Sequence, residues 1–210
     1  MRTIILRVDP EQPALEVIER AADAIKRGEL VAFPTETVYG LAADAFNKKA
    51  VARVFEVKGR PANNPLPVQV ASLDDVRRLA AENPDVAVRL MERHFPGPLT
   101  IVFRASDKVS EMITAGTGKV GIRMPDHPVA LALIRAAGTP IVAPSANTSG
   151  EPPPTTADEV LAYLDGRIEM ILDAGPTQLK ISSTVVDVTE SPPRILREGS
   201  ITAEMLCQCF

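Results

Sequence analysis

Two cations stand two residues apart in the segment Lys58-Gly59-Arg60-Pro61. Gly59 allows a tight turn or a close approach of the backbone to a ligand, and Pro61 keeps Arg60 out of the helical region. Lysine offers a phosphate a point charge, whereas arginine offers it a planar, two-pronged donor. The segment therefore suits a phosphate ligand. The alternative is the solvated end of a helix, where basic side chains also interact favourably with the helix dipole.

A dense cluster of small hydrogen-bonding groups follows the apolar run 140–142. Three hydroxyls, one carboxamide and one glycine fall within residues 145–150, and prolines occupy positions 152–154. Such a composition is typical of a solvated loop, because these side chains form turns with their own backbone. It also suits a cradle for a polar ligand at the end of a buried strand. Both interpretations stay open at this point.

Other candidate ligand-binding residues also lie at the ends of predicted strands. Arg123 follows an apolar strand, where it either pairs within the protein or recognises a carboxylate. Arg197 ends a later strand, where it either faces a phosphate or pairs with Glu198. Thr35 and Thr37 follow an earlier strand, and their hydroxyls either bind a small polar ligand or, for Thr37, cap a helical turn. In open α/β sheets, ligands bind beyond the strand ends, which favours one shared site.

The elements that position these residues follow from hydrophobic periodicity. Apolar residues at helical spacing predict helices over residues 14–27, 50–58, 84–94 and 126–137, and helices that begin near residues 72, 156 and 202. Asp126 is the expected cap of the helix that ends at residue 137. Short apolar runs predict strands over residues 30–33, 67–70, 99–103, 119–123, 140–142, 168–172, 184–188 and 195–197. This mixture predicts an α/β or α+β fold around one mixed sheet.

Length and composition fit one globular domain over residues 1–210. The chain is 45% apolar and 24% charged, and it has no repeat, low-complexity tract or linker. Its net charge of −4 and isoelectric point of about 5.3 argue against a general nucleic-acid binder, which carries a basic footprint. Cys207 and Cys209 provide neither a disulfide framework nor a CxxC pair, which fits a reducing compartment.

Several kinds of segment and motif are missing from the sequence. The N-terminal segment has no long apolar region and no cleavage site, and no apolar run approaches the ~18 residues that span a bilayer. We therefore expect a soluble, cytoplasmic protein with no membrane partner. Neither His94 nor His127 has a second histidine or cysteine at metal-ligand spacing. No P-loop, dinucleotide-binding glycine motif or GxSxG motif occurs, so a nucleotide would be held in another way.

Seven motifs occur in the order found in the YrdC/Sua5 family, and through them the chain resembles that family from about residue 14 to residue 202. They are TETVYGL at 35–41, KGRP at 58–61, PGPLT at 96–100, VGIRMP at 120–125, PSANTSG at 144–150, STVVD at 183–187 and REG at 197–199. The resemblance implies an α/β fold with a twisted, mixed open sheet, flanking helices and a large, positive, concave cavity. The chain is similar to the short form of the family, because longer relatives add a linker and a second domain.

The resemblance also implies an activity, threonylcarbamoyl-AMP synthesis. Members of the family use L-threonine, bicarbonate and ATP, with Mg²⁺, to form threonylcarbamoyl-adenylate and pyrophosphate. The product supplies the t6A modification at position 37 of tRNA through downstream transfer machinery, so a contact with tRNA is also an expectation. The resemblance leaves the Mg²⁺ ligands unidentified.

The resemblance assigns roles to residues at the matched positions. Lys58, Arg60, Ser145 and Asn147 match the family's catalytic set, which also binds the phosphates of ATP. Arg197 matches a further position that contacts the nucleotide. The first four are the expected catalytic residues, and all five are expected to bind ATP.

Four other residues match threonine-binding positions: Thr35, Asn64, Arg123 and Ser183. Arg123 is the expected partner of the amino-acid carboxylate. Asn64 departs from the family pattern, since many relatives have histidine before Pro-Leu. A carboxamide donates and accepts hydrogen bonds but does not titrate near neutral pH.

Three alternative functions remain open on the sequence. The first is binding of double-stranded RNA in the same cavity without catalysis, which the acidic isoelectric point disfavours. The second is carbamoyl adenylation of the kind carried out by multidomain hydrogenase-maturation proteins, whose extra modules this chain lacks. The third is a ligand-binding regulator, which the intact set of Lys58, Arg60, Ser145 and Asn147 disfavours.

Overall fold

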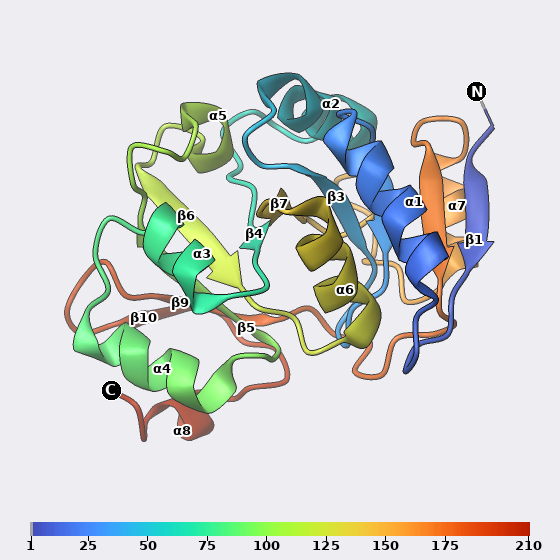
Figure 1. Ribbon diagram of the computed structural model, residues 1–210. Coiled ribbons are helices and arrows are strands. Elements are labelled where there is room, and N and C mark those ends of the chain that lie inside the picture. The colour runs from blue at the N-terminus through green and yellow to red at the C-terminus, as the bar shows by residue number, and fades with distance from the viewer. Residues whose placement is uncertain (1) are drawn as a thin grey trace.

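The computed structural model describes residues 2–210, which fold around a ten-stranded mixed sheet (Figure 1). The strands are β1 (Ile4–Arg7), β2 (Val31–Phe33), β3 (Gly40–Asp44), β4 (Val68–Gln69), β5 (Leu99–Arg104), β6 (Lys119–Arg123), β7 (Ile141–Val142), β8 (Met170–Asp173), β9 (Thr184–Asp187) and β10 (Arg194–Arg197). Their order across the sheet is β1-β8-β2-β3-β7-β4-β6-β5-β9-β10. Parallel pairs such as β5 with β9 alternate with antiparallel pairs such as β5 with β6, so the predicted mixed α/β sheet is confirmed.

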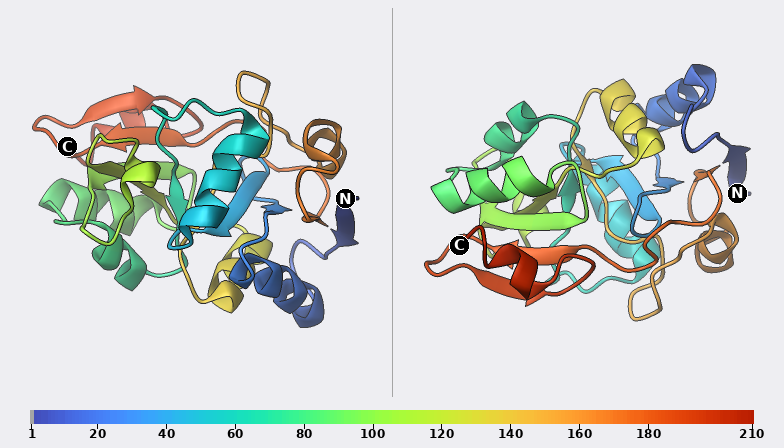
Figure 2. Two further views of the ribbon diagram at one scale, coloured as in Figure 1. Left: turned by 90° about the horizontal axis from the view of Figure 1, so that it is seen from above. Right: turned by 90° about the horizontal axis from the view of Figure 1, so that it is seen from below.

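Eight helices pack around this sheet within residues 2–210. They are α1 (Leu15–Lys26), α2 (Lys48–Lys58), α3 (Leu73–Leu79), α4 (Asp85–His94), α5 (Glu111–Thr114), α6 (Pro128–Ala137), α7 (Ala157–Leu164) and α8 (Ala203–Leu206). Helices α1 and α6 pack side by side, as Figures 1 and 2 show, and their buried residues share a cluster with β2, β7 and β8. Helices α2 and α7 belong to a second cluster on the other side of these strands. Within residues 2–210, no helix has the length and apolar character needed to cross a bilayer.

Side-chain alternation along the strands produces the two clusters. Val31 and Phe33 of β2 pack in the cluster of α1 and α6, whereas the intervening Ala32 packs in the cluster of α2 and α7. Successive residues of a strand point to opposite faces of the sheet, so a strand that is buried on both faces is apolar throughout. This explains why β2 reads as a continuous apolar run.

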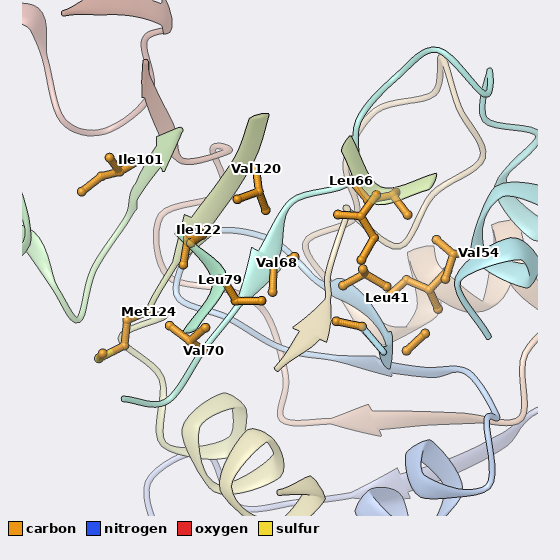
Figure 3. Packing of buried hydrophobic residues seen from close by; sticks show 14 of the residues in the cluster. Leu41, Val54, Leu66, Val68, Val70, Leu79, Ile101, Val120, Ile122 and Met124 are labelled. Atoms are coloured by element: carbon orange, nitrogen blue, oxygen red, sulfur yellow. The ribbon is translucent and has the colours of Figure 1, made fainter. Parts of the chain in front are cut away.

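The second half of the sheet is apolar on one face only. Figure 3 shows Val120 and Ile122 of β6 in the same cluster as Val68 of β4 and Leu79 of α3. The residues that alternate with them on β6 include Arg123, which faces away from this cluster and lines a cavity. One face of this half therefore builds the core, and the other face is free to build a site.

The structure contains three elements that periodicity did not predict: β1, β3 and α5. Strand β3 has the sequence Gly-Leu-Ala-Ala-Asp, which lacks the β-branched and aromatic residues typical of strands. Strand β1 lies at the sheet edge and is largely exposed, and α5 has only four residues. Neither presents enough residues for a periodic pattern.

The predicted cap of α6 was wrong. His127, not Asp126, occupies the capping position, and its Nδ1 accepts a hydrogen bond from the backbone N–H of Val129 at 3.2 Å. Pro128 takes the first helical position, where its missing N–H costs nothing. The residue before a proline avoids the helical region, which places the cap at His127.

Candidate functional site

A cavity of about 440 Å³ lies on the polar face of the second half of the sheet. Strand residues that alternate with the core form part of its wall: Thr100 and Val102 of β5, Gly121 and Arg123 of β6, and Val185 and Asp187 of β9. Loops at residues 35–38, 64–67, 143–145 and 182–183 complete it. The site therefore occupies a sheet face as well as the ends of strands, where the sequence had placed it.

The cavity is positive although the protein is acidic. Its lining contains the four cations Arg60, Lys119, Arg123 and Arg197 but only one carboxylate, Asp187, so four positive charges minus one negative leave +3. Asp187 already pairs with Lys119, whose Nζ lies 2.9 Å from Oδ2. Because the whole chain carries −4, this concentration of positive charge marks a site for anionic ligands.

Lys58 lies behind the wall of the cavity. It is the last residue of α2, and Gly59 follows it in the left-handed conformation with φ of 57°. Its Nζ donates hydrogen bonds of 2.5 Å to the backbone carbonyls of Ser145 and Asn147. Burial, followed by the positive charge of Arg60, lowers the pKa of Lys58 to about 7. The two carbonyls oppose this decrease in pKa, since they bind the charged ammonium more strongly than a neutral amine.

Arg60 lines the cavity and is fixed by its own loop. Its Nε donates to the carbonyl of Asn64 at 3.0 Å, and its Nη2 donates to Asn64 Oδ1 and to the carbonyl of Pro65 at 2.7 Å. Burial lowers the pKa of Arg60. Asn64 also lines the cavity, so its amide both contacts the ligand space and holds the guanidinium.

The segment 143–151 meets the cavity only at its beginning. Ser145 lines the cavity and bridges to Gly40 of β3, but residues 146–150 do not reach the lining. The amide of Asn147 donates to the carbonyls of Thr148 at 3.0 Å and Glu151 at 2.7 Å. Asn147 thus shapes its own loop, and its buried Oδ1 has no hydrogen-bond partner within residues 2–210.

The predicted threonine-binding side contains a buried network around Arg123. Arg123 Nη1 donates to Thr37 Oγ1 at 2.9 Å, and its Nε donates to the carbonyl of Gly97 at 3.1 Å. Thr35 Oγ1 lies 2.8 Å from Thr37 Oγ1 and donates to the carbonyl of Val38 at 2.7 Å. Hydroxyls at positions 35 and 37 and one guanidinium therefore meet at one end of the cavity.

Arg123 also forms an ion pair with Glu36. Its Nη2 lies 2.6 Å from Glu36 Oε2, and both side chains are about 95% buried. The two groups are not oriented for a hydrogen bond, so neither Nη2 nor either Glu36 oxygen has a hydrogen-bond partner among the described residues. The sequence left open whether Arg123 pairs within the protein or binds a carboxylate, and the structure shows that it is paired and also lines the cavity.

Ser183 and Arg197 lie next to each other in the cavity wall. Arg197 donates to the carbonyl of Ser183 through Nε at 3.0 Å and Nη2 at 2.9 Å, and Ser183 Oγ lies 2.8 Å from Thr100 Oγ1. The backbone of Gly199 lies close to residues 182–184, because a Cβ there would lie 2.2 Å from the carbonyl oxygen of Ser182. Of the two alternatives that the sequence left open for Arg197, pairing with Glu198 is absent from the ion pairs of residues 2–210.

The structure thus brings seven of the nine predicted site residues to the cavity wall, and it places Lys58 and Asn147 directly behind that wall. Sequence reasoning missed Gln69, Thr100, Lys119 and Asp187, which also line the cavity. Their common signal is alternation, since each is a polar residue next to buried apolar residues on a strand. Gln69 shows it most clearly, since it lies between Val68 and Val70, is 4% exposed, and has an Oε1 without a partner in the described chain.

Comparison with known proteins gives consistent matches. The family model Sua5_yciO_yrdC, described as "Telomere recombination", matches residues 23–199. The threonylcarbamoyl-AMP synthase of Pyrococcus abyssi is 50% identical over 187 residues, which cover 89% of this chain and 55% of the relative. The threonylcarbamoyl-AMP synthase of Bacillus subtilis is 50% identical over 190 residues, which cover 90% of this chain and 55% of the relative.

A solved structure agrees with these matches. Pyrococcus abyssi Sua5 complexed with L-threonine has a TM-score of 0.96 and 48% identity, over 99% of this chain and 61% of that chain. The chain spans about half the length of the curated relatives it matches. Because the family model covers most of the sequence and the identities reach 50%, the chain belongs to the Sua5/YciO/YrdC family.

Proposed function

We propose that this chain forms threonylcarbamoyl-AMP and pyrophosphate from L-threonine, bicarbonate and ATP. The observation that carries the proposal is the positive cavity, in which Arg60, Arg123 and Arg197 surround one space of about 440 Å³. A volume of this size suits a small-molecule site. The names of the similar relatives and the L-threonine complex of Pyrococcus abyssi Sua5 support the same reaction.

The proposed reaction needs no protein nucleophile. The amine of threonine and bicarbonate give a carbamate with loss of water. A carbamate oxygen then attacks the α-phosphorus of ATP, the bond to the bridging oxygen breaks, and pyrophosphate leaves. Transfers of this kind depend on positioning and on neutralisation of charge.

The cavity residues divide this work between two of the substrates. Arg123, with the hydroxyls of Thr35 and Ser183, receives the amino acid, and Arg60, Ser145 and Arg197 receive the nucleotide phosphates. Lys58 contributes indirectly, because its ammonium binds the carbonyl of Ser145 and so fixes that part of the cavity wall. Asn147 acts in the same indirect way through its loop.

We propose that Mg²⁺ arrives as a complex with ATP. No group of three or more histidine, cysteine, aspartate or glutamate side chains within residues 2–210 is arranged to hold a metal ion. Mg²⁺ commonly keeps several waters and is bound through substrate phosphates with one or two carboxylates. Asp187 is the only carboxylate among the described lining residues, so it would be the protein's contribution.

The product would pass to transfer machinery for the t6A modification of tRNA, in the cytoplasm. Cys207 and Cys209 are both free, which agrees with a reducing compartment. Double-stranded RNA binding without catalysis is not favoured, because the similar relatives are named as synthases. Any contact with tRNA would occur when the product is transferred, after the proposed reaction.

The test is pyrophosphate release by the purified chain with ATP, Mg²⁺ and bicarbonate, with and without L-threonine. We expect release that requires both L-threonine and bicarbonate, with L-serine as the control for selectivity. Release without L-threonine would indicate a simple ATPase. No release from folded protein would contradict the proposed reaction, and titration with ATP and with duplex RNA would then separate the binding functions.

A further inference from the structure

Glu36 carries a buried charge that the proposed reaction does not use. The residue is 4% exposed and is absent from the cavity lining, although its neighbours Thr35 and Thr37 line it. Both of its carboxylate oxygens lack a hydrogen-bond partner within residues 2–210. A buried carboxylate without hydrogen bonds is costly, so its presence beside Arg123 calls for a physical explanation.

Orientation of Arg123 does not require Glu36. Two neutral acceptors already fix the guanidinium, since Nε donates to the carbonyl of Gly97 and Nη1 donates to Thr37 Oγ1. Glu36 contributes an ion pair of 2.6 Å but no hydrogen bond to Nη2. Its contribution to Arg123 is therefore charge rather than geometry.

The charge of Glu36 bears directly on a ligand carboxylate. Arg123 lines the cavity, so a carboxylate that binds there shares the guanidinium with Glu36. Two carboxylates on one guanidinium repel each other, and burial strengthens that repulsion because little water screens it. The free energy of carboxylate binding at Arg123 is thereby reduced.

We propose that Glu36 sets the affinity of the amino-acid carboxylate subsite by competing, from inside the protein, for the charge of Arg123. Glu36 is a positioning residue that acts on the substrate only through Arg123. The inference rests on the proposed function, since it takes L-threonine as the ligand. It predicts that removal of the Glu36 charge tightens the binding of ligands that carry a carboxylate and does not tighten the binding of ligands without one.

The experiment measures binding of L-threonine and of threoninol by calorimetry to the full chain and to Glu36→Gln. Threoninol keeps the amine, hydroxyl and methyl groups but has no carboxylate. We expect Glu36→Gln to bind L-threonine about tenfold more tightly than the wild type, from loss of one nearby like charge. Threoninol keeps the positively charged amine but has no carboxylate to be repelled, so it should bind Glu36→Gln equally or more weakly than the wild type. General damage to the fold would weaken both ligands and would not change their ratio.

A matched control removes a carboxylate from another ion pair. Glu169 pairs with Arg53 at 2.8 Å and does not line the main cavity, so Glu169→Gln should leave the affinity for L-threonine unchanged.

Glu36→Asp is the second variant if Glu36→Gln does not fold, because the shorter side chain withdraws the charge from Nη2 of Arg123. It should tighten the binding of L-threonine two- to threefold, again without tightening that of threoninol.

The outcomes separate this inference from the proposed function. If the wild type binds L-threonine and both Glu36 variants bind it equally well or more weakly, the inference is overturned and the proposed function stands. Tightening in a chain that releases no pyrophosphate would support the inference and count against the reaction. A wild-type chain that binds no L-threonine would overturn both, because the carboxylate subsite would then have no such ligand.

Discussion

The ammonium of Lys58 donates a hydrogen bond to the backbone carbonyl of Ser145, which lies 87 residues further along the chain. The same ammonium donates to the carbonyl of Asn147, so one buried charge at the end of α2 holds the loop after β7. Of the four predicted catalytic residues, Lys58 therefore joins Ser145 to Asn147. This arrangement makes Lys58 important for stability as well as for the proposed reaction.

Lys58→Met should lower both stability and turnover. The substitution keeps an unbranched apolar stem but leaves two buried carbonyls without their donor, so we expect a loss of roughly 3 kcal/mol in the free energy of unfolding. Urea unfolding measures this loss, and pyrophosphate release measures turnover. Lys49→Met in the same helix is the control, since Lys49 is exposed and should change neither. Wild-type stability in Lys58→Met would show that the ammonium does not hold the loop.

Binding of ATP should take up a proton above neutral pH. The pKa of Lys58 in the free protein is about 7, so at pH 8 roughly nine-tenths of the side chains are neutral. Nearby phosphates raise that pKa, and the chain then binds up to about one proton with the nucleotide. At pH 6 the ammonium is already charged, and uptake should be close to zero.

Calorimetry in two buffers of different ionisation enthalpy measures this proton uptake. Lys58→Met should show none at pH 8. Equal uptake at pH 8 in the wild type and in Lys58→Met would assign the proton to another group.

Arg197→Met should raise the KM for ATP by about tenfold and change the KM for L-threonine much less. In the proposed reaction Arg197 receives the phosphates of ATP; it lines the cavity and, among the described residues, donates to the carbonyl and the hydroxyl of Ser183. Steady-state pyrophosphate release with each substrate varied in turn separates the two effects. Arg194→Met removes an exposed charge from the same strand and serves as the control. A larger effect on L-threonine than on ATP would place the phosphates elsewhere.

Stability should fall as the pH falls through about 6.5, because burial lowers the pKa of His127 from that value. The charge of Glu36 opposes the effect but is the smaller cause. Between 6.5 and the folded pKa, the unfolded chain binds more protons than the folded chain, so the free energy of unfolding decreases with decreasing pH. Below the folded pKa the contribution levels off.

His127→Asn should flatten this dependence. Asparagine keeps a good cap at the start of α6 but does not titrate. Urea unfolding at several pH values between 5.5 and 7.5 measures the slope. Burial also lowers the pKa of His94, so in this variant His94 still contributes to the pH dependence of stability. An unchanged slope would assign the whole effect to His94.

Much of the fold was predictable because the local signals were strong. Strand 119–123 and the helix over 50–58 show clear apolar patterns, and both occur in the structure with nearly the predicted bounds. Strand β3 was not predictable in the same way. Its glycine and alanines are buried because helices pack closely on both faces, and that packing is a tertiary effect which sequence propensity does not express.

The candidate site was predictable as a set of residues but not as an arrangement. The motifs identified Lys58, Asn147 and Arg123, yet only the structure shows that Lys58 and Asn147 bind backbone from behind the wall. The partner of Arg123 also depends on the fold. Glu36 is 87 residues away along the chain, and neither sequence position indicates that the two charges meet.

Alternate residues of β6 face the core and the cavity, and this alternation has a consequence for folding. Val120 and Ile122 build the core, while Gly121 and Arg123 line the cavity, and the pairing of β6 with β5 fixes which set faces which way. A slip of one residue in that register would exchange the two sets, burying Arg123 among apolar side chains and filling the cavity with Ile122. Such a slip is disfavoured because Arg123 would lose its partners Glu36, Thr37 and the carbonyl of Gly97 and would leave an unpaired buried charge. The chain therefore cannot complete its core in this region without assembling its site in the same step.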